Sequence, residues 1–185
     1  MMELTVAEKR ELLILARETI MTYLEKRSKK YPTTANPKYL EKTGVFVTLH
    51  QGKELRGCIG YPLPYKPLYQ AVMDNAISAA TEDPRFQAVT AADMADIDIE
   101  ISVLTPPQEV SKIDQVTVGR DGIVITKGWM KGLLLPQVPV EQGWDREQFL
   151  SHGCLKAGLP PDEWQRGVHI ETFQAIVFGE KKLGR

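Results

Sequence analysis

The segment 97–104 constrains the fold more than any other part of the sequence. Isoleucine or valine occupies positions 97, 99, 101 and 103, whereas Asp98, Glu100 and Ser102 stand between them. Successive side chains of a strand point to opposite faces, so this alternation predicts a strand with one apolar and one polar face. A Pro-Pro pair two residues later stops it. The chain must therefore supply a sheet and something to cover its apolar face.

Three segments have helical signatures. Thr5 and Glu8 form a capping-box pattern before apolar residues at helical spacing, and we expect this helix to close at Tyr31-Pro32. A second helix is predicted from Leu68 to about Thr81, with Pro67 suited to its first turn and four alanines that allow close packing. Asp145 is predicted to cap a third helix, which ends near position 158.

Hairpins separate these helices. Segment 45–50 and segment 53–61 are predicted to pair around a Gln51-Gly52 turn, and segments 122–127 and 130–135 around Gly128. Segment 173–178 is predicted to be a last single strand. Because βαβ units are few, the pattern favours an α+β fold with a mainly antiparallel sheet packed with helices.

Length and composition exclude several classes of protein. The 185 residues fit a single domain, 1–185, in which proline-rich loops and short helices suggest a smaller lobe. A net charge of -1 argues against nucleic-acid binding. No apolar run approaches the roughly 20 residues of a membrane span. The two cysteines lie far apart without metal-ligand spacing, so we expect a reducing, cytoplasmic protein without a metal site, and no cofactor motif is recognised. The sequence does not indicate an oligomeric state.

The hexapeptide Leu55-Arg56-Gly57-Cys58-Ile59-Gly60 is the leading candidate for a functional segment. Glycine inside a strand marks a bulge or a close approach, so the two glycines predict an opening beside the thiol. With a two-residue turn, Arg56 and Cys58 share the face of Val47. A guanidinium near a thiol favours the thiolate. The alternative interpretation is an inert Cys58, because cysteine often behaves as a small buried hydrophobe.

Two other segments carry candidate polar groups. Glu100 pairs with Arg56, acts as a general base beside Cys58, or lies with Ser102 on an exposed sheet face. Arg85 is a second anion contact at its loop, or ties down this loop by an ion pair with Asp83 or Glu82. These alternatives stay open at the level of the sequence.

Several blocks of the chain resemble the AMMECR family. Besides the LRGCIG hexapeptide, the matching blocks are segments 83–86, 99–106, 132–138 and 156–160, in the family's order. The resemblance implies a two-lobed α+β domain with a cleft, and it brings Gln137 into the predicted binding set. It also implies association with a Memo-like metalloprotein and a radical SAM protein, but it implies no reaction.

Two functions therefore remain. In the first, a groove at Leu55–Gly60 binds a small molecule, peptide or partner protein, using Arg56, Gly57, Gly60, Asp83, Arg85, Ser102 and Gln137. In the second, an enzyme uses Cys58 as a nucleophile or redox thiol on a small anionic substrate, with Glu100 as its base. The sequence does not decide whether the protein is an enzyme.

Overall fold

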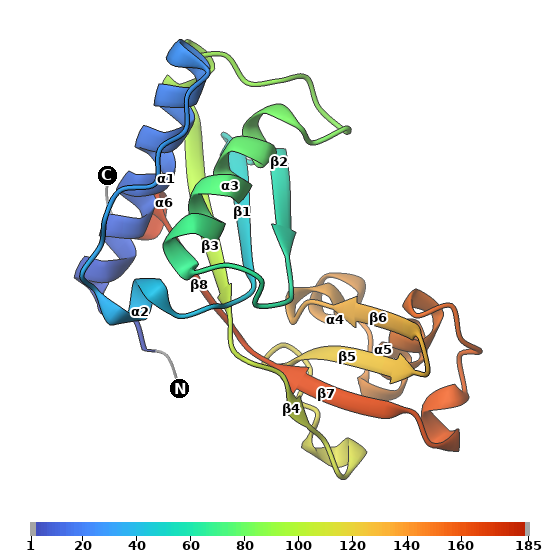
Figure 1. The fold of residues 1–185 in the computed structure, drawn as a ribbon. Helices are drawn as coiled ribbons and strands as arrows, with labels where there is room; N and C mark the ends of the chain where they lie inside the picture. Colours follow the sequence, from blue (N-terminus) through green and yellow to red (C-terminus); the bar gives the residue numbers. More distant parts are fainter. Residues whose placement is uncertain (1–2, 184–185) are drawn as a thin grey trace. The chain divides into compact units, whose positions relative to one another are not determined.

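The computed structural model describes residues 3–183, and the chain divides into two compact units. The first unit comprises Met1–Leu104 and Ile176–Arg185, and the second comprises Thr105–Ala175. Each unit contains a four-stranded sheet (Figure 1). All the strand pairs for which a register is defined are antiparallel.

The first unit has strand order β2-β1-β3-β8, with helices α1 and α3 packed on one face of the sheet. Its elements are α1 (Val6–Lys26), α2 (Pro37–Leu40), β1 (Val45–Gln51), β2 (Glu54–Tyr61), α3 (Leu68–Thr81), the 3-10 helix η1 (Asp93–Ala95), β3 (Ile97–Leu104), β8 (Ala175–Gly179) and α6 (Glu180–Leu183). The core lies between this face and the two helices. The alternating isoleucines and valine of β3 belong to it, as the sequence predicts.

The second unit has strand order β4-β7-β5-β6, and α5 packs against β5 and β6. Its elements are β4 (Gln108–Glu109), the 3-10 helix η2 (Ile113–Gln115), β5 (Gly122–Lys127), β6 (Met130–Leu134), α4 (Gln137–Gln142), α5 (Arg146–Lys156), the 3-10 helix η3 (Glu163–Arg166) and β7 (His169–Phe173). Its separate core is centred on Phe149, Ile123 and Ile125.

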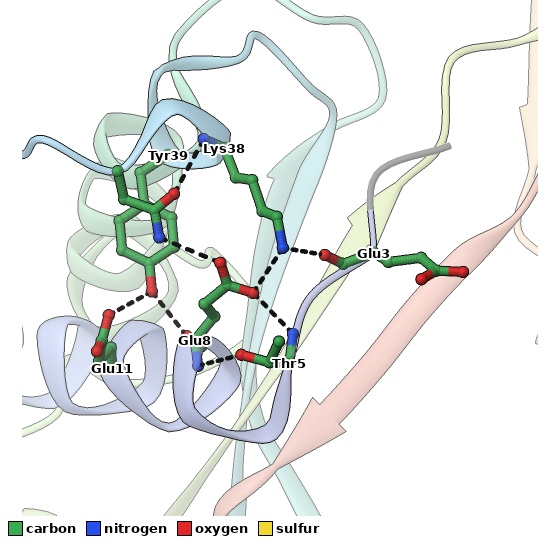
Figure 2. Close-up of polar contacts among 7 residues, drawn as sticks. Glu3, Thr5, Glu8, Glu11, Lys38 and Tyr39 are labelled. Carbon is green, nitrogen blue, oxygen red and sulfur yellow. Dashed lines mark hydrogen bonds and ion pairs between the residues drawn. The ribbon is translucent and has the colours of Figure 1, made fainter.

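The predicted capping box begins α1. Thr5 Oγ1 accepts a hydrogen bond from Glu8 N at 3.2 Å, and Glu8 Oε2 accepts one from Thr5 N at 2.7 Å. The same carboxylate receives Lys38 Nζ at 2.9 Å, while Tyr39 Oη donates to Glu11 Oε2 at 2.6 Å (Figure 2). The hydrogen bond from Lys38, followed by that from the Thr5 amide, holds the pKa of Glu8 at about 2. These contacts join the start of α1 to α2.

Two predicted boundaries are wrong. Helix α1 ends at Lys26 rather than at Tyr31-Pro32, because Arg27 takes a left-handed conformation, φ 50°, and its amide donates to Tyr23 O. The predicted strand 173–178 is two strands, β7 and β8, which divide at Gln174. No glycine or proline marks that division, so the sequence offered no signal for it. The short helix α4 is not predicted from the sequence, because Pro136 before it and Pro139 within it are residues that usually interrupt a helix.

No helix in residues 3–183 is long and apolar enough to cross a membrane.

Candidate functional site

The register of the β1–β2 hairpin decides which way Cys58 points. The turn residues are Gly52 and Lys53, since Gln51 pairs with Glu54, and an irregularity follows at Leu49/His50. As a result Cys58 lies opposite Thr48 rather than on the face of Val47. The predicted register is therefore wrong. The physical reason is that a turn shifted by one residue and a bulge together reset every pairing beyond them.

Cys58 lies on the sheet face opposite α1 and α3. Thr48 pairs with Cys58 on one side and with Glu100 on the other, so the three side chains form a row across β2, β1 and β3. Thr48 Oγ1 donates a hydrogen bond to Cys58 Sγ at 3.3 Å. The next row holds Ser102, Phe46 and the glycine at position 60. We call Phe46, Thr48, Cys58, Glu100 and Ser102 the Cys58 face.

The row of side chains sets the distance between the Glu100 carboxylate and the Cys58 thiol. Glu100 shares a face with Cys58, but Thr48 stands between them, so the two side chains are separated by two inter-strand spacings, or roughly 10 Å. A general base needs about 3 Å to the proton that it takes. The Glu100 carboxylate instead lies 3.5 Å from Lys182 Nζ of α6. Direct proton transfer between Glu100 and Cys58 is therefore not supported by the geometry.

Arg56 occupies the irregular part of β2 and does not lie beside Val47. Its Nη1 donates to the carbonyl oxygen of Gln87 at 2.5 Å, in the loop after α3. The predicted pairing of Arg56 with Glu100 is thus replaced by a contact that joins β2 to this loop. The extra residue of the bulge is what moves the guanidinium off the apolar face.

Asp83 and Arg85 hold the backbone of β2 at Cys58. Asp83 Oδ2 accepts a hydrogen bond from Cys58 N at 2.8 Å, and Arg85 Nη2 donates to Cys58 O at 3.3 Å. Arg85 Nε and Nη2 also grip the Asp83 carboxylate at 3.0 and 2.8 Å. The hydrogen bond from Arg85 is the main reason that the pKa of Asp83 lies well below its usual range. We call this set the Asp83–Arg85 clamp.

The clamp satisfies the outward-facing groups of an edge strand. Strand β2 ends the sheet order, so the amide and carbonyl of Cys58 would otherwise be open to another strand. Asp83 is 5% exposed, so its carboxylate is a buried, structural group of the first unit. Of the two alternatives left by the sequence, the ion pair between Arg85 and Asp83 is the one that the structure contains.

The two glycines of the hexapeptide do mark close approaches, but they open no space beside the thiol. A Cβ on Gly57 would lie 2.1 Å from the carbonyl oxygen of Ala79, because α3 crosses the buried face of β2 there. A Cβ on Gly60 would lie 2.5 Å from Cγ of Phe46 and 2.3 Å from the carbonyl oxygen of Val45. The expected opening is therefore wrong, because neighbouring backbone and an aromatic ring already occupy it.

The remaining candidates divide between the units. Ser102 is buried on the Cys58 face, whereas Gln137 begins α4 in the second unit. Within residues 3–183, no group of three or more His, Cys, Asp or Glu side chains is arranged to hold a metal ion. Thr48 is not among the residues predicted from the sequence, although a threonine between two buried apolar residues, Val47 and Leu49, is a visible signal.

These observations define an α+β protein of two antiparallel sheets, one of which presents a thiol on a polar face beside a clamped edge strand. The AMMECR1 family model matches residues 13–178, and the chain belongs to the AMMECR1 family.

Protein MK0488 of Methanopyrus kandleri strain AV19 is 48% identical over 190 residues, covering 97% of this chain and 92% of that protein. Protein MJ0810 of Methanocaldococcus jannaschii is 49% identical over 177 residues, covering 89% and 86%. The crystal structure of protein PH0010 from Pyrococcus horikoshii matches with a TM-score of 0.81 and 44% identity, covering 92% of this chain and 90% of that one. The family and the α+β fold class predicted from the sequence are thereby confirmed.

Proposed function

We propose that this chain is a binding module that presents the Cys58 face to a protein partner in a multi-protein pathway. The observation that carries the proposal is the combination of a half-buried thiol in a polar row with an edge strand fixed by the Asp83–Arg85 clamp. The clamp restrains the backbone at Cys58, and a restrained surface loses less conformational entropy on binding.

The chemistry of the face also favours binding over catalysis. Phe46 provides an aromatic anchor, while Thr48, Glu100 and Ser102 provide hydrogen-bonding groups around it. Aromatic anchors within polar surroundings are typical of protein interfaces. The partner that we propose is a Memo-like protein, with a radical SAM protein in the same pathway, because these associations follow from the family resemblance.

Calorimetric titration of the purified chain with a purified Memo-like protein tests this proposal. Cys58→Leu, which adds bulk to the face, is expected to weaken binding at least tenfold, whereas Cys58→Ser retains it. Glu100→Gln is expected to weaken binding several-fold. Glu147→Gln is the matched control, because Glu147 is an exposed glutamate of α5 in the second unit. No measurable binding, or equal binding by wild type and Cys58→Leu, would contradict the proposal.

A second candidate function, catalysis by the Cys58 thiol, is favoured by one observation. Thr48 Oγ1 donates to Cys58 Sγ, so a hydroxyl holds the sulfur in position, and the thiolate is the form that would attack a substrate. In this candidate the substrate is a small anionic molecule.

The rate of iodoacetamide alkylation at Cys58, followed against pH, tests the catalytic candidate. A plateau reached by neutral pH, lost in Thr48→Val, would support it. Cys154 provides an internal comparison, because it is fully buried and burial raises the pKa of its thiol. A Cys58 alkylated no faster than Cys154, with a rate still rising near pH 8.5 like that of an ordinary thiol, removes the nucleophile.

A further inference from the structure

A cavity lies in the helical layer of the first unit, apart from the Cys58 face. It has a volume of about 380 Å³, within the usual range for small-molecule sites. One wall is α1, another is Met73 of α3, and the segment 28–32 supplies the rest. In Figure 1 the chain that leaves α1 runs back beside this helix toward α2. The cavity is therefore bounded by three separate stretches of the chain.

Thr19 is the most informative residue of its lining. It stands in the middle of α1 and is 7% exposed, yet its hydroxyl makes no hydrogen bond within residues 3–183. The hydroxyl is not sealed within the core, because the fully buried side-chain oxygens without a partner in residues 3–183 are those of Tyr61, Asp98 and Thr126; that of Thr19 faces the cavity. Thr22, one turn further along α1, adds a second hydroxyl to the same wall. The wall therefore offers hydrogen bonds that the described protein does not use.

The charge of the lining is positive. Lys26, Lys29 and Lys30 line the cavity, against one carboxylate, that of Glu18, which leaves a formal charge of +2. Lys29 is engaged by Asp74 at 2.6 Å. Neither Lys26 nor Lys30 forms an ion pair within the described part of the chain. Two ammonium groups without an ion pair, those of Lys26 and Lys30, thus line the cavity beside the carboxylate of Glu18 and are available to an anion.

The segment that carries Lys29 and Lys30 is fastened to α3. Tyr31 Oη donates to Asp74 Oδ1 at 2.6 Å, and the Tyr31 ring meets the Tyr69 ring edge-on, with centroids 6.2 Å apart. Lys66 gives Asp74 a third contact, at 2.5 Å. Asp74 therefore holds one side of the cavity in place without a ligand. A wall fixed in advance is what a small-molecule site needs.

We propose that this cavity binds a small phosphorylated metabolite, with its phosphate held by Lys26, Lys30 and the Thr19 hydroxyl. A phosphate monoester carries a charge of about −1.5 to −2 at neutral pH, which matches the positive charge of the lining. Ammonium groups and hydroxyls are both donors to phosphate oxygens. Leu15, Met73 and Pro32 provide apolar surface for the organic part of the ligand. A cavity of this size takes one small molecule rather than a polymer.

Calorimetry with ribose 5-phosphate as the probe, and ribose as the uncharged comparison, tests this site. The wild-type chain is expected to bind ribose 5-phosphate with a Kd below about 1 mM, an ordinary affinity for a small ligand, and not to bind ribose. Thr19→Val keeps the shape of the side chain but removes its hydroxyl, and is expected to raise the Kd about tenfold. Lys30→Gln is expected to act similarly, and Lys53→Gln, in the β1–β2 turn, serves as the matched lysine control.

Three outcomes would overturn the site. Failure of wild type to bind ribose 5-phosphate is one. Equal binding of ribose 5-phosphate by wild type and Thr19→Val is another, since it would mean that the lysines attract the phosphate non-specifically. Equal losses in Lys30→Gln and Lys53→Gln form the third. Thr19→Ser restores the hydroxyl and must restore affinity, which separates loss of binding from loss of fold. Cys58→Leu is expected to leave the Kd unchanged, so the result does not depend on the proposed function.

Discussion

In both units a helix packs closely against an edge strand, but the aspartate–arginine pairs of the two units bind different parts of the backbone. Each has a helix that crosses an edge strand at a glycine: α3 over Gly57 of β2, and α5 over Gly132 of β6. Each also has an aspartate gripped by a nearby arginine. In the first unit Asp83 fastens the edge strand itself, whereas in the second Asp121 accepts from Thr117 N in the turn before β5. A carboxylate–guanidinium pair thus identifies a candidate site only when its backbone partner belongs to a functional segment.

The glycine substitutions are expected to have the largest effects. A Cβ would meet Ala79 O at 2.1 Å in Gly57→Ala, and Ala157 N at 2.4 Å in Gly132→Ala. Because the obstacles are backbone atoms, the helix must shift, and each change is expected to reduce the free energy of unfolding by roughly 3 kcal/mol. Chemical denaturation measures the loss.

Gly179→Ala is the matched strand control. Its new Cβ would come no closer than 3.3 Å to a neighbour, so a loss of about 1 kcal/mol or less is expected. Hydrogen exchange would locate the damage, in the first unit for Gly57→Ala and in the second for Gly132→Ala. A loss in Gly57→Ala no greater than that in Gly179→Ala would disprove the close approach of α3.

Substitutions of the two aspartates are expected to have the next largest effects, and to differ in the alkylation rate of Cys58. Asp83→Asn and Asp121→Asn are each expected to cost about 1–2 kcal/mol, below the gross value of charge-assisted bonds because both arginines are more than half exposed. Only Asp83→Asn should accelerate alkylation of Cys58, since it frees the backbone of β2. Equal alkylation rates in the two variants would mean that the clamp does not restrain the thiol.

The Asp83–Arg85 clamp also predicts a pH dependence. The pKa of Asp83 is lowered in the folded protein, chiefly by Arg85, from an ordinary value of 3.8. Its contribution to stability is therefore complete above that ordinary value and disappears as the pH falls toward the lowered one. Asp83→Asn should accordingly flatten the acid limb of the stability curve below pH 4, as denaturation at several pH values can measure.

The helix caps allow a subtler comparison. Both α1 and α5 begin with a capping box, but the reciprocal residue is Glu8 in the first and Gln148 in the second. The pKa of Glu8 is lowered to about 2 from 4.5, so its contribution to the α1 cap is present above pH 4.5 and lost toward pH 2. Hydrogen exchange in the first turn of α1 should rise across this window in wild type. In Glu8→Gln this rise in hydrogen exchange should be absent. If the rise persists in the variant, a titrating group other than Glu8 causes it.

The smallest expected effect concerns the helix ends. Arg27 follows α1 with φ 50°, whereas Gly143 follows α4 with φ 68°. Left-handed backbone is strained for a residue with a Cβ, so Arg27→Gly is expected to stabilise the protein by up to about 1 kcal/mol. Gly143→Ala should destabilise it by a similar amount. Thermal unfolding of both variants checks the opposite signs, and destabilisation by Arg27→Gly would indicate that the arginine side chain contributes more than its backbone costs.

The sequence by itself determined the elements whose signals are local. The strand 97–104, the capping box at Thr5, the helix cap at Asp145 and the hairpin around Gly128 are all present as predicted, because period, capping chemistry and turn residues act within a few positions. The same local pattern, together with the family resemblance, was enough to identify the α+β class.

Tertiary structure alone decided where those elements meet. A one-residue shift of the turn and a bulge placed Cys58 beside Thr48, sent Arg56 to Gln87, and put Thr48 between Cys58 and Glu100. The hexapeptide by itself could not show that the space beside Gly57 is filled by α3. Register and helix approach depend on partners distant in sequence, and a change of one residue exchanges the faces of a strand.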